Sequence, residues 1–99
     1  MSEDDYCLSQ IVFAAFTWAA MNKRHNKAFG RVLKTLRTKK QLTQETLGFE
    51  SSLDRAYISL LERGKRSPTL DTLVTLCAPL GVSLTFIAAS IELEAEHDE

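Results

Sequence analysis

The residues of this sequence that could do chemistry are mainly charged, and the cationic ones are concentrated in one part of the chain. Residues 6–44 contain eight Lys and Arg and no Asp or Glu. Residues 1–5 contain three acids, residues 45–68 balance four acids against four bases, and residues 69–99 contain six acids and no base. The net charge of −1 and the pI of about 6.1, taken alone, argue against a nucleic-acid binder. The charge is segregated, however, with a basic middle and acidic ends, so the whole-chain average is misleading.

Nucleophiles and metal ligands form no recognisable group. Cys7 and Cys77 lie 70 positions apart without a CxxC spacing, which indicates neither a zinc site nor a disulfide framework and fits a reducing, cytoplasmic setting. His25 and His97 lie in basic and acidic flanks and are expected to be exposed. P-loop, GxSxG and HExxH motifs are absent from the sequence. We therefore expect no enzyme activity, no cofactor and no metal.

Length and composition predict one small helical domain. The 99 residues leave no room for a second core. A hydrophobic fraction of 44% and a charged fraction of 25% are ordinary for a folded globular chain. Only four Gly and two Pro are present, which favours helices joined by short loops over the many turns of a sandwich or barrel.

The stretch from Tyr6 to Met21 carries no charge and is apolar on nearly all sides of a helix. It is shorter than the roughly 20 residues that span a bilayer, and the acids before it do not fit a secretory signal, so we expect no membrane contact. Burial on nearly all sides is expected to come from the chain's own body and from a second copy. In an alternative interpretation, Met21 is the natural start and the preceding residues are an optional extension.

The rest of the chain predicts five helices with recognisable ends. Apolar residues at positions 29, 32, 33 and 36 predict a basic amphipathic helix from about Ala28 to Lys40. Thr43 is expected to cap a short helix over residues 44–50, with Leu47 and Phe49 as its apolar residues. Asp54 is expected to cap a helix that ends before Gly64, which is suited to a left-handed C′ position.

Two further helices complete the pattern. Thr69 is expected to cap a fourth helix that ends at Gly81 and has an apolar face made of Leu70, Leu73, Val74, Cys77 and Leu80. Ser83 is expected to cap a fifth, with a stripe made of Leu84, Ile87, Ala88 and Ile91 and with Phe86 off the stripe. Residues 92–99 form an acidic tail that is expected to fray. The predicted divisions are an arm with a basic linker (1–27), a helical domain (28–91) and the tail (92–99).

Two short helices about one turn apart, with one supporting helix before and two after, are typical of a helix-turn-helix. The sequence here resembles the Cro/C1 (Xre-type) DNA-binding family, including its small controller and repressor proteins. The resemblance extends from about Phe29 to Ile91 and rests on the runs LTQETL at 42–47 and YISLLERGKRSPTL at 57–70. It implies an all-α, lambda-repressor-like fold of five helices, to which this chain adds an apolar N-terminal helix.

The family pattern implies a positioning helix at residues 44–50 and a recognition helix at residues 55–63 that enters the major groove. The implied base-reading residues are Arg55, Ala56, Ser59 and Leu60, with Arg55 suited to guanine and Ala56 to a thymine methyl. The implied phosphate contacts are Thr43, Gln44, Tyr57, Arg63, Lys65, Arg66 and Arg37. Arg37 and Glu62 also stand where the family pairs two helices. The alternative to DNA contact is that Arg55, Lys65 and Arg66 are solvated surface charges. In the same way, Tyr57 and Leu60 would pack inward.

Two residues depart from the family pattern. Ser52 occupies a turn position where the family usually has glycine, so a left-handed conformation there is expected to be strained. Gly48 stands where the family prefers alanine, which allows close packing but weakens the helix by about 1 kcal/mol.

The function implied is sequence-specific binding of double-stranded DNA by a homodimer, on a pseudo-palindromic operator, for transcription regulation. The expected dimer surface comprises Phe13, Phe16, Trp18, Leu84, Phe86, Ile87 and Ile91, although the fifth helix would equally serve to close the monomer core. The alternative function is that of an antitoxin-like or adaptor protein whose arm binds another protein. A further hypothesis is that the acidic tail folds back on the basic surface and weakens DNA binding.

Overall fold

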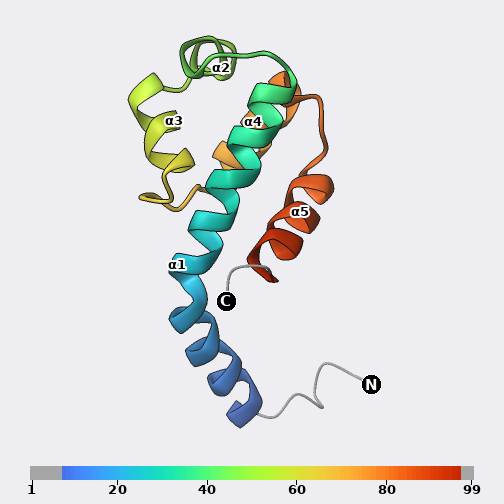
Figure 1. Ribbon diagram of the computed structural model, residues 1–99. Helices are drawn as coiled ribbons and strands as arrows, with labels where there is room; N and C mark the ends of the chain where they lie inside the picture. The colour runs from blue at the N-terminus through green and yellow to red at the C-terminus, as the bar shows by residue number, and fades with distance from the viewer. Residues whose placement is uncertain (1–7, 97–99) are drawn as a thin grey trace.

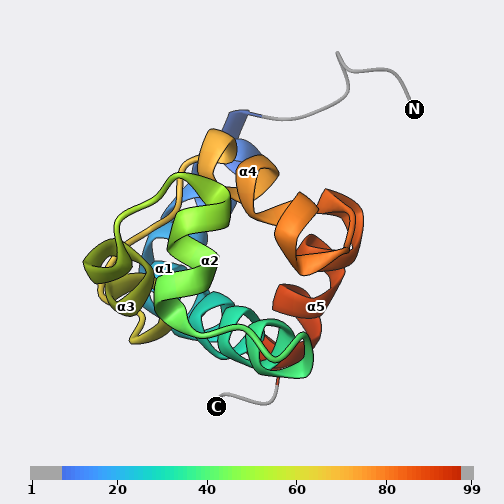
Figure 2. The same ribbon diagram turned by 90° about the horizontal axis from the view of Figure 1, so that it is seen from above.

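One long helix is the axis of the structure, and the other helices pack around its C-terminal half (Figure 1). The computed structural model describes the backbone of residues 8–96 and the side chains of residues 24–96. This part of the chain forms five α-helices and no strand: α1 (Leu8–Lys39), α2 (Gln44–Ser51), α3 (Arg55–Glu62), α4 (Leu70–Leu80) and α5 (Leu84–Glu96). The two views agree that α3 and α5 lie on opposite sides of α1 (Figures 1 and 2). The predicted all-α class is confirmed.

Helix α1 is longer than the sequence pattern predicts. It runs without interruption over 32 residues, so the predicted start near Ala28 is too late and residues 22–27 are helical rather than a linker. The reason is that no Gly or Pro occurs before Gly30 in this helix, and nothing else in the sequence stops it. The predicted dimer contacts of Phe13, Phe16 and Trp18 fall on residues whose side chains lie outside the described part.

The predicted N-caps of α2, α3, α4 and α5 are confirmed. Each of the four N-caps accepts a hydrogen bond from a backbone N–H two or three residues later. The bonds are 3.0 Å from Thr46 to Thr43, 3.0 Å from Ala56 to Asp54, 3.1 Å from Thr72 to Thr69 and 3.0 Å from Phe86 to Ser83. Gly64 and Gly81 adopt the left-handed conformation, with φ of 71° and 70°, so both stop a helix as expected.

The core contains residues from all five helices, but α4 presents a different face to it than predicted. The fully buried side chains are Phe29, Leu33, Leu47, Ile58, Leu61, Leu76, Leu80 and Ile87. In α4, Leu70 is 66% exposed and Val74 is 53% exposed, whereas Leu76 is completely buried. Phe49 of α2 is also outside the core, at 86% exposure. Because α4 is apolar on several sides, periodicity could not select the side that packs inward.

The end of α5 also differs from the prediction. Residues 92–96 do not fray but continue the helix, and Ala95 is buried against the rest of the chain. Glu94 Oε1 accepts a hydrogen bond from Arg31 Nε at 2.8 Å, which joins α5 to α1. Helix α5, which carries this acid, lies on the side of α1 opposite α3 and away from the predicted DNA contacts (Figure 2).

The turn between α2 and α3 has the conformation that the sequence pattern predicted for it. Ser52 is left-handed, with φ 59° and ψ 33°. Leu53 donates its N–H to the carbonyl oxygen of Gly48 at 2.8 Å, which ends α2 in the manner of a Schellman motif. A Cβ atom on Gly48 would lie 2.6 Å from the carbonyl oxygen of Leu53, so the close packing expected of this glycine is confirmed.

We predict that Ser52→Gly stabilises the protein. Glycine adopts the left-handed conformation without the steric penalty of a Cβ, so the free energy of unfolding is expected to rise by about 1 kcal/mol in urea denaturation. The matched control is Ser51→Gly, one residue earlier, where the hydroxyl donates to the carbonyl oxygen of Leu47 at 2.6 Å within the helix. That variant should be less stable than the parent. An equal loss from both variants would contradict the prediction.

Candidate nucleic-acid interface

Most of the residues predicted to contact DNA line one continuous surface. A hollow of about 390 Å³ is lined in part by Arg37, Thr43, Gln44 and Arg55. A second hollow of about 400 Å³ is lined by Gln44, Asp54, Arg55, Ala56 and Ser59. The two share Gln44 and Arg55, so the N-terminus of α2 and the first half of α3 form a single interface. It brings the predicted base-reading residues beside the predicted phosphate site.

Helix α3 has one face in the core and the opposite face open. Ile58 and Leu61 are completely buried and anchor the helix. Arg55 and Ala56 are exposed in its first turn and Ser59 is half-buried one turn later, all on the outward side. The cap at Asp54 fixes where the helix begins and therefore which residues project first. This face can be presented to a groove without moving the core.

The two apolar candidates on α3 behave differently. Tyr57 is half-buried and packs against the core cluster, which agrees with the alternative of inward packing. Leu60 is also half-buried but is not among the side chains that pack on that cluster. Of these two side chains, Leu60 is therefore the better placed to contact a base.

A buried carboxylate connects three helices behind this surface. Glu62 accepts hydrogen bonds from Arg37 Nε at 2.6 Å, from Arg37 Nη2 at 3.1 Å and from Gln44 Nε2 at 3.1 Å. Arg37 Nη1 donates to the carbonyl oxygen of Leu42 at 2.8 Å. The side chains of Glu62 and Arg37 are only 4% and 12% exposed. Arg37 thus holds α1, the following loop and α3 together, and most of its donors are already engaged.

The remaining basic candidates lie at the other end of α3. Arg63, Lys65 and Arg66 are exposed and do not line either hollow. Arg63 Nε donates to the carbonyl oxygen of Ser59 at 3.4 Å. Gly64 between them packs on Lys27, where a Cβ would lie 2.9 Å from that side chain. The loop is therefore held against α1, with its charges directed outward.

Sequence reasoning missed three polar residues at the interface. Gln41, Glu45 and Asp54 line the two hollows beside the predicted residues. Gln41 is left-handed, with φ 60°, and ends α1 there because Leu42 donates to the carbonyl oxygen of Arg37 at 3.0 Å. The sequence signal that could have identified them is their position within two residues of Thr43 or next to Arg55. Two of them, Glu45 and Asp54, bring carboxylates to a surface that also carries Arg37 and Arg55.

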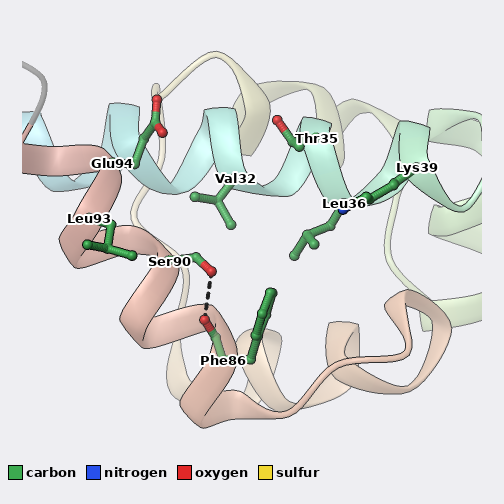
Figure 3. A pocket seen from close by; sticks show the side chains of 8 residues that line it. All are labelled: Val32, Thr35, Leu36, Lys39, Phe86, Ser90, Leu93 and Glu94. Atoms are coloured by element: carbon green, nitrogen blue, oxygen red, sulfur yellow. Dashed lines mark hydrogen bonds between the residues drawn. The ribbon is translucent and has the colours of Figure 1, made fainter.

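The candidate dimer surface on α5 is only partly open. Ile87 is 1% exposed and belongs to the monomer core, so its predicted place in a dimer contact is wrong. Leu84 and Ile91 are half-buried. Phe86 is 50% exposed and points from α5 into a groove toward α1 (Figure 3).

In the described part of the chain, no single helix is long and apolar enough to span a membrane. Helices α4 and α5 meet these two criteria only when they are taken together, as a pair bent by 103°.

Comparison with known proteins gives consistent matches. The helix-turn-helix family model matches residues 33–87. The control protein C.MunI from a Mycoplasma species is 42% identical over 67 residues, which cover 67% of this chain and 90% of that protein.

Two solved structures are similar in both sequence and fold. The restriction-modification controller protein C.AhdI from Aeromonas hydrophila has a TM-score of 0.61 and 40% identity, covering 63% of this chain and 94% of that one. The controller protein C.Esp1396I, solved as a tetramer with its natural 35-base-pair operator, has a TM-score of 0.66 and 33% identity. That match covers 73% of this chain and 95% of the controller chain.

We predict that Glu62→Gln lowers the free energy of unfolding by about 2 kcal/mol, because it leaves the enclosed guanidinium of Arg37 without its charged partner. Urea denaturation measures the change. The matched control is Glu94→Gln, which breaks the exposed pair with Arg31 and should cost less than about 0.5 kcal/mol. Similar losses from the two variants would show that the Glu62 network does not hold the helices together.

Proposed function

Because this chain belongs to the Cro/C1-type helix-turn-helix family, we propose that it regulates transcription as a restriction-modification controller protein, binding a pseudo-palindromic operator as a homodimer. The observation that carries the proposal is the joined surface at the start of α2 and α3, where Arg55 and Ala56 project from an anchored helix. The similar controller proteins, one of them solved on its operator, support the same conclusion.

Reading of the bases begins with Arg55. Its guanidinium lies in the first turn of α3, and a helix that enters the major groove end-on directs its first-turn side chains at the base edges. A bidentate contact from Arg55 to guanine O6 and N7 is the strongest discrimination that this surface offers. Ala56 and Leu60 supply methyl contacts suited to thymine, and Ser59 bonds to either kind of base.

Phosphate contacts hold the recognition helix in register from both ends. At one end, α2 presents free backbone N–H groups at Gln44 and the positive end of its dipole. At the other end, Arg63, Lys65 and Arg66 extend from the loop after α3. The Gln44 side chain is bonded to Glu62, so its backbone and not its amide is the free anion-binding group. Affinity is therefore expected to fall steeply with salt concentration.

Dimer formation sets the operator symmetry. One recognition helix reads about half of a site, and a two-fold dimer reads two half-sites in inverted orientation. The half-exposed Phe86, which lies off the stripe of Leu84 and Ile91, is the apolar residue of α5 proposed for this contact. Because α5 lies across α1 from α3, dimerisation there leaves both recognition helices open (Figure 2).

Binding to DNA from upstream of the gene for this chain, in excess scrambled competitor at two salt concentrations, tests base recognition. We predict that Arg55→Ala lowers specific affinity about tenfold to a hundredfold and relaxes selectivity at one position of each half-site. The control variant Lys65→Ala should weaken specific and non-specific binding alike and lower the salt slope by about one. Binding that is indifferent to sequence and to Arg55 would refute specific recognition through α3.

Dimerisation is tested by Phe86→Glu. A carboxylate at the contact would be desolvated without a partner, so we predict a monomer in sedimentation at concentrations where the parent is a dimer. The affinity for the operator should fall because the dimer dissociates. Val74→Glu is the matched control, because Val74 is 53% exposed on α4, outside the proposed surface. If Phe86→Glu remains dimeric, α5 does not form the contact.

A further inference from the structure

A groove with an apolar floor runs along α1 on the side opposite the recognition helix. It has a volume of about 300 Å³, with Val32 and Leu36 on one wall and Phe86 and Leu93 on the other (Figure 3). Leu93 is 62% exposed. A second hollow of about 210 Å³ continues the groove, sharing Leu36, Lys39 and Phe86 with it and adding Lys40. The groove therefore has apolar side chains on both walls, with Thr35, Ser90 and Glu94 among them, and it is basic at the end nearest the C-terminus of α1.

The N-terminal segment of the sequence has the matching order of residue types. Glu3, Asp4 and Asp5 are followed by the uncharged, largely apolar stretch of residues 6–21. An acidic end that leads into an apolar stretch is complementary to a basic end that leads into an apolar groove.

We propose that the groove of each copy receives the N-terminal segment, residues 1–16, of a second copy, with the two α1 helices antiparallel. The acids at positions 3–5 then lie at Lys39 and Lys40 of the other chain, and apolar residues of the segment cover Phe86 and Leu93. The inference rests on the homodimer of the proposed function and specifies how its two chains are joined.

The segment cannot reach the basic end of its own groove. At a rise of about 1.5 Å per residue, the helical residues from Leu8 to Lys39 span about 47 Å. Seven residues, fully extended, reach only about 24 Å beyond the start of the helix. The N-terminal half of α1 also points away from the other helices (Figure 1). If the N-terminal segment fills a groove of this kind, that groove therefore belongs to another copy.

Charge selects the antiparallel arrangement. A parallel pair would place both acidic ends together and both basic halves together, and like charges repel. An antiparallel pair places each acidic end against the eight bases of residues 6–44 of the other chain. It is also two-fold symmetric, so one contact occurs twice and the assembly closes as a dimer.

The arrangement predicts which residues approach each other. If Asp4 lies opposite Lys39 and both chains advance equally, Cys7 lies opposite Leu36 of the other copy, next to Thr35. Thr35 is exposed and lines the groove, whereas Thr38 is exposed on the same helix but does not line it. These two threonines provide a matched pair of positions for cross-linking.

The test uses the full chain with Cys77→Ala, so that Cys7 is the only native thiol left. Thr35→Cys and Thr38→Cys are each added, and a short bismaleimide is applied at a concentration where the protein is dimeric. We expect Thr35→Cys to give at least five times more covalent dimer than Thr38→Cys, and Cys7→Ser to abolish the product. Equal yields, or a product that survives Cys7→Ser, would overturn the proposal.

A charge exchange supplies a second readout that does not depend on cysteine geometry. Lysine at positions 3, 4 and 5 should raise the dimer dissociation constant about tenfold, and so should glutamate at positions 39 and 40. The combined variant should recover most of the loss, and the absence of recovery would count against the proposal.

Operator binding by the same proteins separates the two levels of the proposal. An uncross-linked dimer that binds its operator would refute the arm exchange and leave the proposed function intact. A cross-linked dimer that binds no specific DNA would refute the proposed function and leave the arm exchange intact.

Discussion

The enclosed carboxylate of Glu62 is the interaction on which the arrangement of this protein depends. It stands at the last residue of the recognition helix, and its two oxygens accept bonds from Arg37 of α1 and Gln44 of α2. A carboxylate that is only 4% exposed must be paired, because burying an uncompensated charge costs several kcal/mol. The pairing therefore fixes the relative positions of the three helices that form the surface proposed to face DNA.

Close backbone contact adds to this constraint at two glycines. A Cβ on Gly30 of α1 would lie 2.5 Å from the carbonyl oxygen of Glu62, and one on Gly48 of α2 would lie 2.6 Å from that of Leu53. Both glycines let a helix approach the backbone of the recognition helix, or of the turn before it, more closely than any other residue allows. The direction in which Arg55 projects is thus set by backbone packing from behind as well as by the cap at Asp54.

Helix α1 separates two kinds of surface. On one side it positions α3, whose outward residues are polar or small and whose neighbouring loop is basic. On the other side it forms an apolar groove with α5 (Figure 3). The proposed recognition of DNA and the proposed association of two chains therefore use opposite faces of one helix. In the proposed dimer, that helix would link the contact between the chains to α3, since α1 contacts both α3 and α5.

The sequence by itself determined the N-caps of α2 to α5, the all-α class and the residues of the proposed recognition surface, because caps, left-handed glycines and a dense motif are local signals. It placed Arg55, Ala56 and Ser59 correctly on the open face of α3. Only the tertiary structure decided which side of α4 packs inward, that α5 continues to a buried Ala95, and that Ile87 serves the monomer core. These outcomes depend on which neighbour covers a helix that is apolar on several sides, and periodicity within one segment contains no information about its neighbours.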